Sequence, residues 1–338
     1  MDDVFRREVL SLMPEVPRFT RHTMLKAALR LTLVSASLVL FSCDLGEIPT
    51  NYHNRILFTS SRSGINQLYM VNPDGSDLRP LTEGPYANAY GLWSPDARKI
   101  AFASTENAVI GWDPLIFVMN SDGTSRHSLG VRGNVTGWAR DNHRILYEGC
   151  PLCEGGGDLS QYIYTINADG TGAQQLTRNP GGVQVFDHGA CYSANETRIF
   201  FISNRFNPSQ LNSELYMMNA DGTNLQRLTY YGPGEDSGIP SVSPDGTMIA
   251  FGSQQQGISR YGIFVMNTDT TDLRLVIESA VTLDYSVPRW SPNESQLVIR
   301  STKVGQTTIN FMDVVNLDGS GLRRVIPDQI EGLPDWSW

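Results

Sequence analysis

Three cysteines and one histidine are spaced in this sequence as a metal site or a disulfide requires. Cys150 and Cys153 form a C-x-x-C pair, and His188 and Cys191 form an H-x-x-C pair further along the chain. Three thiols and an imidazole at this spacing suit a tetrahedral zinc ion. In an oxidising compartment, neighbouring thiols form a disulfide instead. The sequence leaves three alternatives open: a disulfide, a structural zinc site, or unbonded thiols.

A second group of polar residues contains several carboxylates, each close to the start of a strand-like apolar segment. The group comprises Asp187, His188, Glu235, Asp236, Asp284, Tyr285 and Arg289. Carboxylates beside a histidine can act as general bases or hold a cation. The same residues could also line a water-filled channel that binds nothing. We treat them as candidates for ligand binding or for a bound cation, and we assign no catalytic residue.

Motifs of several enzyme classes are absent from the sequence. The chain has no G-x-S-x-G nucleophile elbow, no H-E-x-x-H zinc motif and no phosphate-binding Gly-Lys loop. Two of its five histidines, His22 and His53, lie near the N-terminus. Too few remain for a lyase that binds its metal through several histidines, so the sequence favours a non-enzymatic role.

Composition and charge restrict the partners further. The chain has 338 residues, of which 40% are hydrophobic and 18% are charged, so it can bury a large core. Its formal net charge is −9. Because binding to nucleic acid requires clustered Lys and Arg, we expect no nucleic-acid partner.

The segment 24–43, MLKAALRLTLVSASLVLFSC, has the composition of a targeting signal. Lys26 and Arg30 precede the apolar stretch Leu31–Phe41. This stretch is too short to span a bilayer as a helix. The sequence Leu-Phe-Ser-Cys at its end resembles a bacterial lipobox. The resemblance implies that Cys43 carries lipid and begins the mature chain. An ordinary secretory signal with a chance cysteine is the alternative.

The N-terminal part of the chain thus divides into three. Residues 1–23 carry Asp2, Asp3, Glu8 and Glu15, which are unusual before a signal peptide, so translation could begin at Met24 rather than Met1. We interpret residues 24–42 as a lipoprotein signal peptide and residues 43–54 as a lipidated tether. The mature protein would then lie in the bacterial cell envelope, on its periplasmic side or outer surface, with the lipid as its membrane attachment.

The remaining residues, 55–338, repeat a pattern with a period near 48 residues. The turn Asn-x-Asp-Gly occurs five times, and a sixth copy has Thr270 in place of the Gly. Asp-Gly between two strand-like runs is a strong hairpin signal, because Gly accepts a positive φ. The turn aspartates are Asp74, Asp122, Asp169, Asp221, Asp269 and Asp318, at intervals of 48, 47, 52, 48 and 49 residues.

A second landmark precedes each of these turns from the second unit onward, usually an aromatic residue followed by a turn such as Ser-Pro-Asp. Its first residue is Trp93, Trp138, Tyr192, Val242 or Trp290. Each unit therefore reads as four short strands, and no helical period is sustained after the signal. Units of four strands at this length are typical of a β-propeller. We expect an all-β protein with six four-stranded antiparallel blades.

The repeated residues WSPD, KIAF and LIFVMNSDG resemble the TolB-type, WD-like propeller repeat over about residues 55–338. The resemblance implies a monomeric ring that presents a loop face to a protein or carbohydrate ligand of the envelope. The candidates from Asp187 to Arg289 would surround the mouth of its channel. A lyase or lactone hydrolase with a metal-assisted site at that mouth is the alternative.

The first unit, which begins at Arg55, lacks an innermost strand. The last residues, LPDWSW (333–338), repeat the beginning of that strand. We expect this segment to complete the N-terminal blade and close the ring. Trp336 would then be a core residue equivalent to Trp93 and Trp290.

Deletion of residues 333–338 is expected to destabilise the whole propeller, because the first and last blades would expose unpaired backbone and apolar faces. Thermal unfolding of the purified protein measures the effect. A truncated chain that melts at the wild-type temperature would contradict the closure.

Overall fold

The structure is a computed structural model. It describes residues 52–108, 114–150, 160–179, 181, 184–205, 212–230, 236–254, 261–280, 283–303, 309–330 and 332–337. The chain divides into two units, residues 1–51 and residues 52–338. The predicted signal peptide and Cys43 lie outside the described residues. Within the described part, no helix has the length and apolar character needed to cross a membrane.

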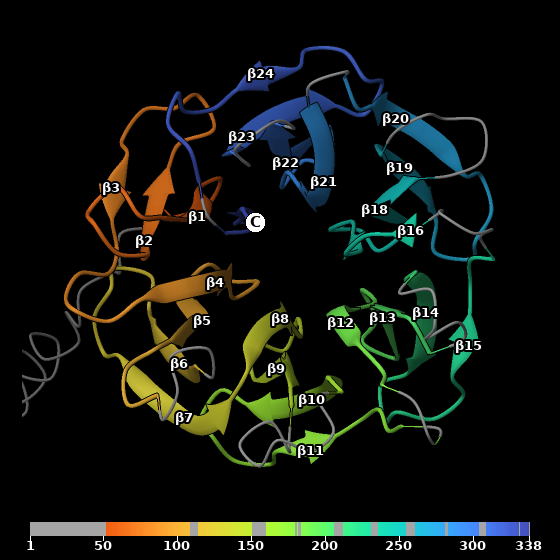
Figure 1. Cartoon of the computed structure of the whole chain (residues 1–338), viewed down its shortest axis with the longest axis horizontal. Coiled ribbons are helices and arrows are strands. Elements are labelled where there is room, and N and C mark those ends of the chain that lie inside the picture. The colour runs from red at the N-terminus through yellow and green to blue at the C-terminus, as the bar shows by residue number, and fades with distance from the viewer. Residues whose placement is uncertain are drawn as a thin grey trace, which may run out of the picture. The chain divides into compact units, whose positions relative to one another are not determined.

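The second unit is a six-bladed propeller in which antiparallel sheets surround a central channel (Figure 1). From the inside outward, the first blade consists of β25 (Asp335–Trp336), β1 (Ile56–Ser60), β2 (Gln67–Val71) and β3 (Arg79–Pro80). The second consists of β4 (Asn88–Trp93), β5 (Lys99–Ser104), β6 (Leu115–Asn120) and β7 (His127–Arg132). The third consists of β8 (Asn134–Trp138), β9 (Arg144–Gly149), β10 (Tyr162–Asn167) and β11 (Gln174–Gln175).

The other three blades follow the same order. The fourth consists of β12 (Asp187–Tyr192), β13 (Arg198–Ser203), β14 (Glu214–Asn219) and β15 (Gln226–Arg227). In the fifth, both β16 (Asp236–Ser237) and β17 (Ser241–Val242) pair with β18 (Met248–Gln254), followed by β19 (Gly262–Asn267) and β20 (Arg274–Glu278). The sixth consists of β21 (Leu283–Trp290), β22 (Gln296–Lys303), β23 (Ile309–Asn316) and β24 (Arg323–Arg324).

The C-terminal residues complete the first blade, as the sequence predicted. β25 pairs with β1 so that Trp336 lies opposite Ile56. The pairing continues at Ser337, whose N–H donates to the Arg55 carbonyl at 2.8 Å and whose hydroxyl accepts from the Arg55 N–H at 2.7 Å. These bonds join residues 282 positions apart. The two ends of the propeller thus hold each other in one sheet.

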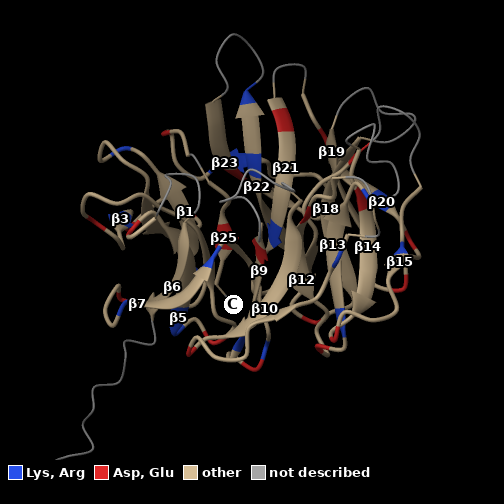
Figure 2. Cartoon of the chain, turned by 60° about the horizontal axis from the view of Figure 1, so that its bottom comes forward, with Lys and Arg blue, Asp and Glu red and all other residues tan. Residues whose placement is uncertain are grey.

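The apolar core is divided among the interfaces between adjacent blades. Trp336 packs with Met312 and Val314 of the sixth blade, and Trp93 packs with Met70 of the first. The aromatic residues that the repeat places at these interfaces are at most 9% exposed; they are Trp93, Trp138, Tyr192, Trp290 and Trp336. Charged residues occur both in the loops and on the strands, where many of them lie close to a strand end (Figure 2).

Two of the indole rings also bond to the preceding blade. Trp138 donates from Nε1 to the Leu92 carbonyl at 3.2 Å, and Trp290 donates to the Ser241 carbonyl at 2.8 Å. Both carbonyls belong to innermost strands. In both cases a backbone carbonyl of an innermost strand faces the next blade. It accepts a hydrogen bond from the indole of the Trp that packs against it.

The Asn-x-Asp-Gly turns share one hydrogen-bond pattern, which extends the motif by one residue. In the second blade, Asp122 Oδ1 accepts from the N–H and the hydroxyl of Thr124, at 2.9 and 2.6 Å, and Asn120 Nδ2 donates to the same hydroxyl. These bonds from Thr124 hold the pKa of Asp122 below its usual value. The equivalent carboxylates, which accept in the same way, are Asp74, Asp169, Asp221, Asp269 and Asp318.

Thr270→Gly is expected to stabilise the protein. Thr270 has a φ of 72°, where the other five turns have Gly at 82° to 87°. A side chain in this left-handed region costs about 1–2 kcal/mol, and Gly costs about 0.5–1 kcal/mol in lost chain entropy. The free energy of unfolding in urea should therefore rise by about 0.5–1 kcal/mol. Gly222→Thr is the reverse control, because its Cβ would lie 2.6 Å from the Leu176 carbonyl oxygen. Equal or lower stability of Thr270→Gly would refute the assignment of strain.

Candidate functional site

Irregularities in the innermost strands shape the channel. The pairing register shifts in β4, β8, β12 and β21, and in the fifth blade the innermost strand is split into β16 and β17. A bulge redirects side chains and increases the local twist. At these points Tyr90, Gly189 and Val287 have φ of 53°, 65° and 51°. We call the part of the channel before the bulges the upper channel and the part beyond them the lower channel.

The lower channel contains a cavity of about 90 Å³. Asp335 lies on its wall, with Oδ2 accepting from the Trp93 N–H at 2.8 Å and Oδ1 3.6 Å from Arg289 Nε. This carboxylate therefore connects the first, second and sixth blades. Arg289 was expected at the channel mouth, but it is 9% exposed and lies beyond the bulge of β21, at the other end of its strand.

Two other predicted mouth residues are buried within the blades. Tyr285 is 3% exposed and belongs to the apolar cluster around Trp290, because its side chain points between the fifth and sixth blades. Asp187 is fully buried and forms an ion pair with Arg205 at 2.5 Å. Both residues serve the interior of the protein instead of a ligand.

His188 and Asp236 lie on neighbouring innermost strands in the upper channel and interact electrostatically. Asp236 accepts hydrogen bonds from the Tyr261 hydroxyl at 2.5 Å and from the Ser213 N–H at 2.6 Å. Burial raises the pKa of Asp236, while these bonds and His188 oppose the change. His188 Nε2 is buried and has no partner in the described part of the chain. Glu235 lies outside that part.

Asp284 occupies the start of β21, where it is half-buried and lies opposite Thr302 in the sheet. It is further from the bulge than Tyr285 along the same strand. The sequence-predicted group is therefore not assembled as one site: His188 and Asp236 come together, Asp187 and Tyr285 are internal, and Arg289 lies in the lower channel.

The cysteines are in different chemical states. Cys150 is in a disulfide, whereas Cys191 has a free thiol and is not its partner. Burial raises the pKa of Cys191 to about 12, so it remains protonated and unreactive. It lines the lower cavity. Cys153 lies outside the described residues, and within them no three His, Cys, Asp or Glu residues are arranged to hold a metal.

Three residues of the upper channel were not identified from the sequence. They are Tyr90, Glu148 and Arg300. Glu148 Oε2 accepts from the Gly189 N–H at 3.2 Å, and Arg300 Nε donates to Ser286 Oγ at 3.2 Å. Burial and the charge of Glu148 raise the pKa of Tyr90, and Arg300 opposes this effect. All three therefore lie in one electrostatic environment at the axis.

Comparison with known proteins supports the fold. Residues 154–338 match the family model described as TolB beta propeller domain. A protein named Protein TolB homolog, from Chlorobium luteolum, is 27% identical over 183 residues, which cover 51% of this chain and 37% of that protein. The chain thus matches well under half the length of this curated relative.

Solved structures give the same picture. The crystal structure of TolB from Acinetobacter baumannii has a TM-score of 0.66 at 19% identity, covering 87% of this chain and 69% of that one. Oligogalacturonate lyase in complex with manganese has a TM-score of 0.54 at 15% identity, covering 80% and 73%. At these identities the likeness establishes the fold alone.

Asp335→Asn is expected to remove a pH dependence of stability between about pH 4 and pH 6. Burial raises the pKa of Asp335 from 3.8 to about 6. The folded state therefore binds the proton more tightly than the unfolded state, so this group stabilises the fold below pH 4, and the stabilisation is lost as the pH rises through 6. The loss should be on the order of 2 kcal/mol.

Denaturant unfolding of the wild type and Asp335→Asn across pH 3.5 to 7.5 measures this difference. Asn keeps an acceptor for the Trp93 N–H and removes the charge. Asp328→Asn, which removes a mostly exposed carboxylate (61% side-chain exposure), is the control and should follow the wild type. An Asp335→Asn profile parallel to the wild type would show that this carboxyl does not titrate in the folded protein as expected.

Proposed function

The chain belongs to the TolB β-propeller family, and from this membership we propose that it is a non-enzymatic binding module that holds a protein partner at its upper-channel face. The observation that carries the proposal concerns two predicted carboxylates. Asp187 is paired with Arg205, and Asp236 already accepts bonds from Tyr261 and Ser213. Asp187 is therefore used in the interior of the protein, and Asp236 is held as a fixed part of the channel wall.

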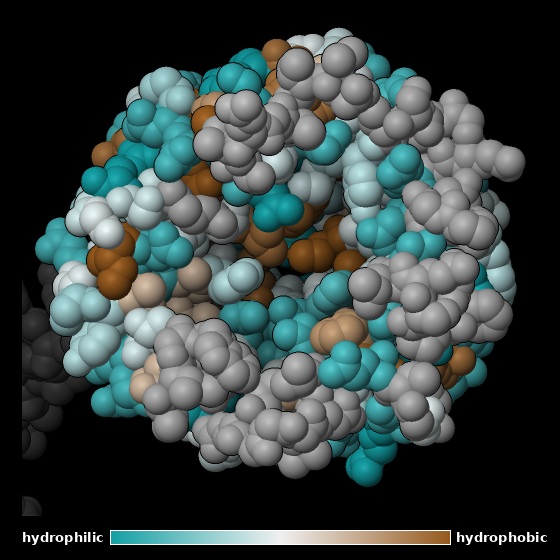
Figure 3. Space-filling model, in the orientation of Figure 1, coloured by the Kyte–Doolittle hydropathy of each residue, from teal (hydrophilic) through white to brown (hydrophobic). Residues whose placement is uncertain are grey.

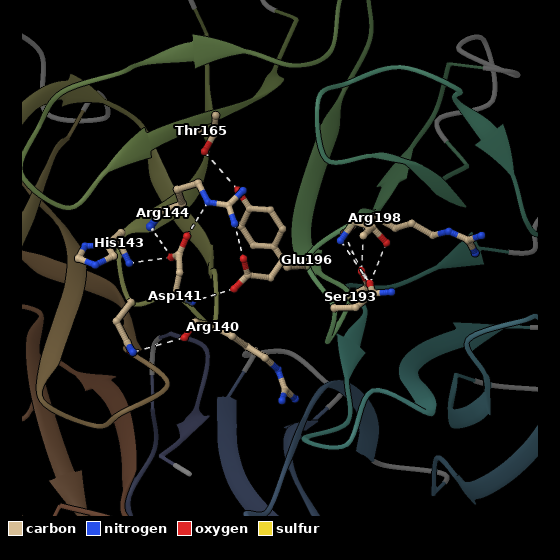
Figure 4. Close-up of polar contacts among 12 residues, drawn as sticks. Arg140, Asp141, His143, Arg144, Thr165, Ser193, Glu196 and Arg198 are labelled. Atoms are coloured by element: carbon tan, nitrogen blue, oxygen red, sulfur yellow. Dashed lines mark hydrogen bonds and ion pairs between the residues drawn. The ribbon is translucent and has the colours of Figure 1, made fainter.

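Contacts between the blades at the lower end of the channel hold the ring, and with it the upper-channel face, in a fixed arrangement. The Asp141 N–H of the third blade donates to Glu196 of the fourth at 2.7 Å, and Arg144 forms ion pairs with both carboxylates (Figure 4). The equivalent turns of the fifth and sixth blades are joined by the Asp245 N–H and Glu294. A surface that is already ordered loses little conformational entropy on binding.

The proposed location is the bacterial cell envelope, outside the cytoplasm. It rests on the signal-like segment 24–42 and on the lipobox-like sequence that ends at Cys43. In this proposal the lipid on Cys43 holds the propeller at a membrane through the tether 43–54, and the ring itself remains monomeric. An envelope carbohydrate is the other ligand class that such a loop face would suit.

One observation favours an enzyme as the second candidate. His188 Nε2 has no partner within the described residues, and His188 interacts electrostatically with Asp236, whose pKa is raised by burial. A lyase or sugar hydrolase could use this pair as acid and base or as two ligands of a metal ion. The manganese-bound oligogalacturonate lyase shares the fold, which is the reason to retain this alternative.

Photo-crosslinking in cells tests the binding role. A benzophenone amino acid at Tyr86, which is 42% exposed in the segment before β4, is expected to capture one envelope protein. Leu225 is the matched control. It is 41% exposed and follows the Asp221 turn of the fourth blade, on the face of the ring away from Tyr86, so it should capture none. Equal capture at both positions, or none at Tyr86, would contradict the proposal.

The same cells test the anchor through Cys43→Ala. The wild type is expected to incorporate radiolabelled fatty acid and to fractionate with membranes. The variant should lose the label and leave the membrane fraction. Cys191→Ala is the control, because its thiol lies inside the propeller. Labelling that persists in Cys43→Ala would rule out this lipid site.

A further inference from the structure

One position of the blade repeat carries opposite charges in opposite blades. The equivalent residues of the second strand, in blade order, are Thr59, Ala103, Glu148, Ile202, Gly252 and Arg300. Four of these residues are uncharged. The strands that carry the two charges, β9 and β22, face each other across the channel (Figure 1). The two exceptions to the repeat therefore lie on opposite walls of one channel.

Arg300 is a partly buried cation that lacks an anion. It is half-buried, and its Nε donates to the neutral Ser286 hydroxyl. No carboxylate lies within ion-pair distance of Arg300 in the described part of the chain. Six other arginines withdrawn from solvent have such a partner: Arg55, Arg126, Arg144, Arg205, Arg227 and Arg289. Arg274, which is also half-buried, donates instead to the Leu317 carbonyl at 2.9 Å. An arginine withdrawn from water without an anion is unfavourable, which indicates that a ligand supplies one.

Glu148 is held in position but its charge is not neutralised. Its two oxygens accept one bond each, from the Gly189 N–H at 3.2 Å and from Asn134 Nδ2 at 3.4 Å. A carboxylate has about four acceptor positions, so about two remain. Within the described residues, no Lys or Arg forms an ion pair with Glu148. The donor of the first bond is at the bulge of β12, which fixes the carboxylate beside the channel.

Tyr90 links the two charges. It projects from the bulge of β4 with a φ of 53° and is 39% exposed. Its hydroxyl responds electrostatically to both Glu148 and Arg300, although these residues belong to the third and sixth blades. The bonds to Gly189 and Ser286 hold the Glu148 and Arg300 side chains against innermost strands, which line the channel. The centre of the ring is hollow on the face shown in Figure 3, and both hydrophobic and hydrophilic residues border the hollow.

We propose that the upper channel binds a small zwitterion, an amino acid or short peptide, with its carboxylate on Arg300 and its ammonium group toward Glu148. Tyr90, which interacts electrostatically with both charges, can donate its hydroxyl proton to the carboxylate. A dianion such as phosphate would be repelled by Glu148, and a simple cation would be repelled by Arg300. A ligand with both charges satisfies both walls of the channel through charge-assisted hydrogen bonds. This inference is independent of the proposed protein partner.

Calorimetric titration of the purified protein at pH 7 tests the site with three small probes that differ in their charged ends, and with inorganic phosphate as a fourth. Glycylglycine carries both charges, N-acetylglycine carries the carboxylate alone, and glycinamide carries the ammonium group alone. Glycylglycine is expected to bind at least tenfold more tightly than either of the other two. Equal binding of all three, or tighter binding of phosphate than of glycylglycine, would overturn the proposal, as would no binding of glycylglycine.

Two variants locate the binding. Arg300→Met keeps the length of the side chain and should weaken glycylglycine binding at least tenfold, and Glu148→Gln should do the same through the other end. Arg98→Met, which removes an exposed guanidinium, is the charge-matched control and should bind as the wild type. Wild-type affinity in both Arg300→Met and Glu148→Gln would overturn the site. If Arg300→Met does not fold, Glu148→Gln decides the question alone.

Discussion

The pairing of β25 with β1 is the interaction on which the rest of the structure depends. Each blade buries its apolar faces only against its neighbours, so a row of blades has two incompletely covered ends. The backbone pairing between Trp336 and Ile56 joins those ends and brings the sixth blade against the first. The ring then has no free inner edge at the first blade, and every apolar cluster is covered on both sides.

Closure also determines what the lower channel can do. Trp336 brings Asp335 with it, and this carboxylate is placed against the Trp93 N–H and near Arg289. Its polar contacts are thus made to three blades of the protein. A group whose charge and hydrogen bonds are used within the fold has little left for a ligand. The lower channel is therefore mainly structural, although it contains a cavity.

The features that could be predicted from the sequence depend on residues close together in the chain. The turn at Asp122 needs only its neighbours Asn120 and Thr124, and the four strands of each blade follow one another directly. The channel residues could not be placed in this way, because each innermost strand is irregular. The shift between Ser286 and Arg289 changes which side chains face inward, so Tyr285 enters the core and Arg289 reaches the other end of the channel.

The six blades differ from one another at single positions of the repeat. Five blades have a stacked aromatic pair such as Phe102–Phe117 between their two middle strands. The sixth has Ile299 opposite Asp313, and this buried carboxylate is paired with Arg324 at 3.0 Å. That departure from the repeat is compensated within the blade.

The departures at Glu148 and Arg300 are different, because neither charge has an opposite charge paired with it among the described residues. A charged residue that is paired within its own blade, as Asp313 is with Arg324, is explained by the fold alone. An uncompensated one lowers stability in the unliganded protein, since a partly desolvated charge without a counter-charge is unfavourable. Two such charges lie on opposite walls of the same channel, where a ligand can reach them. Binding of a ligand that supplies the missing charges is the physical benefit that accounts for both residues together.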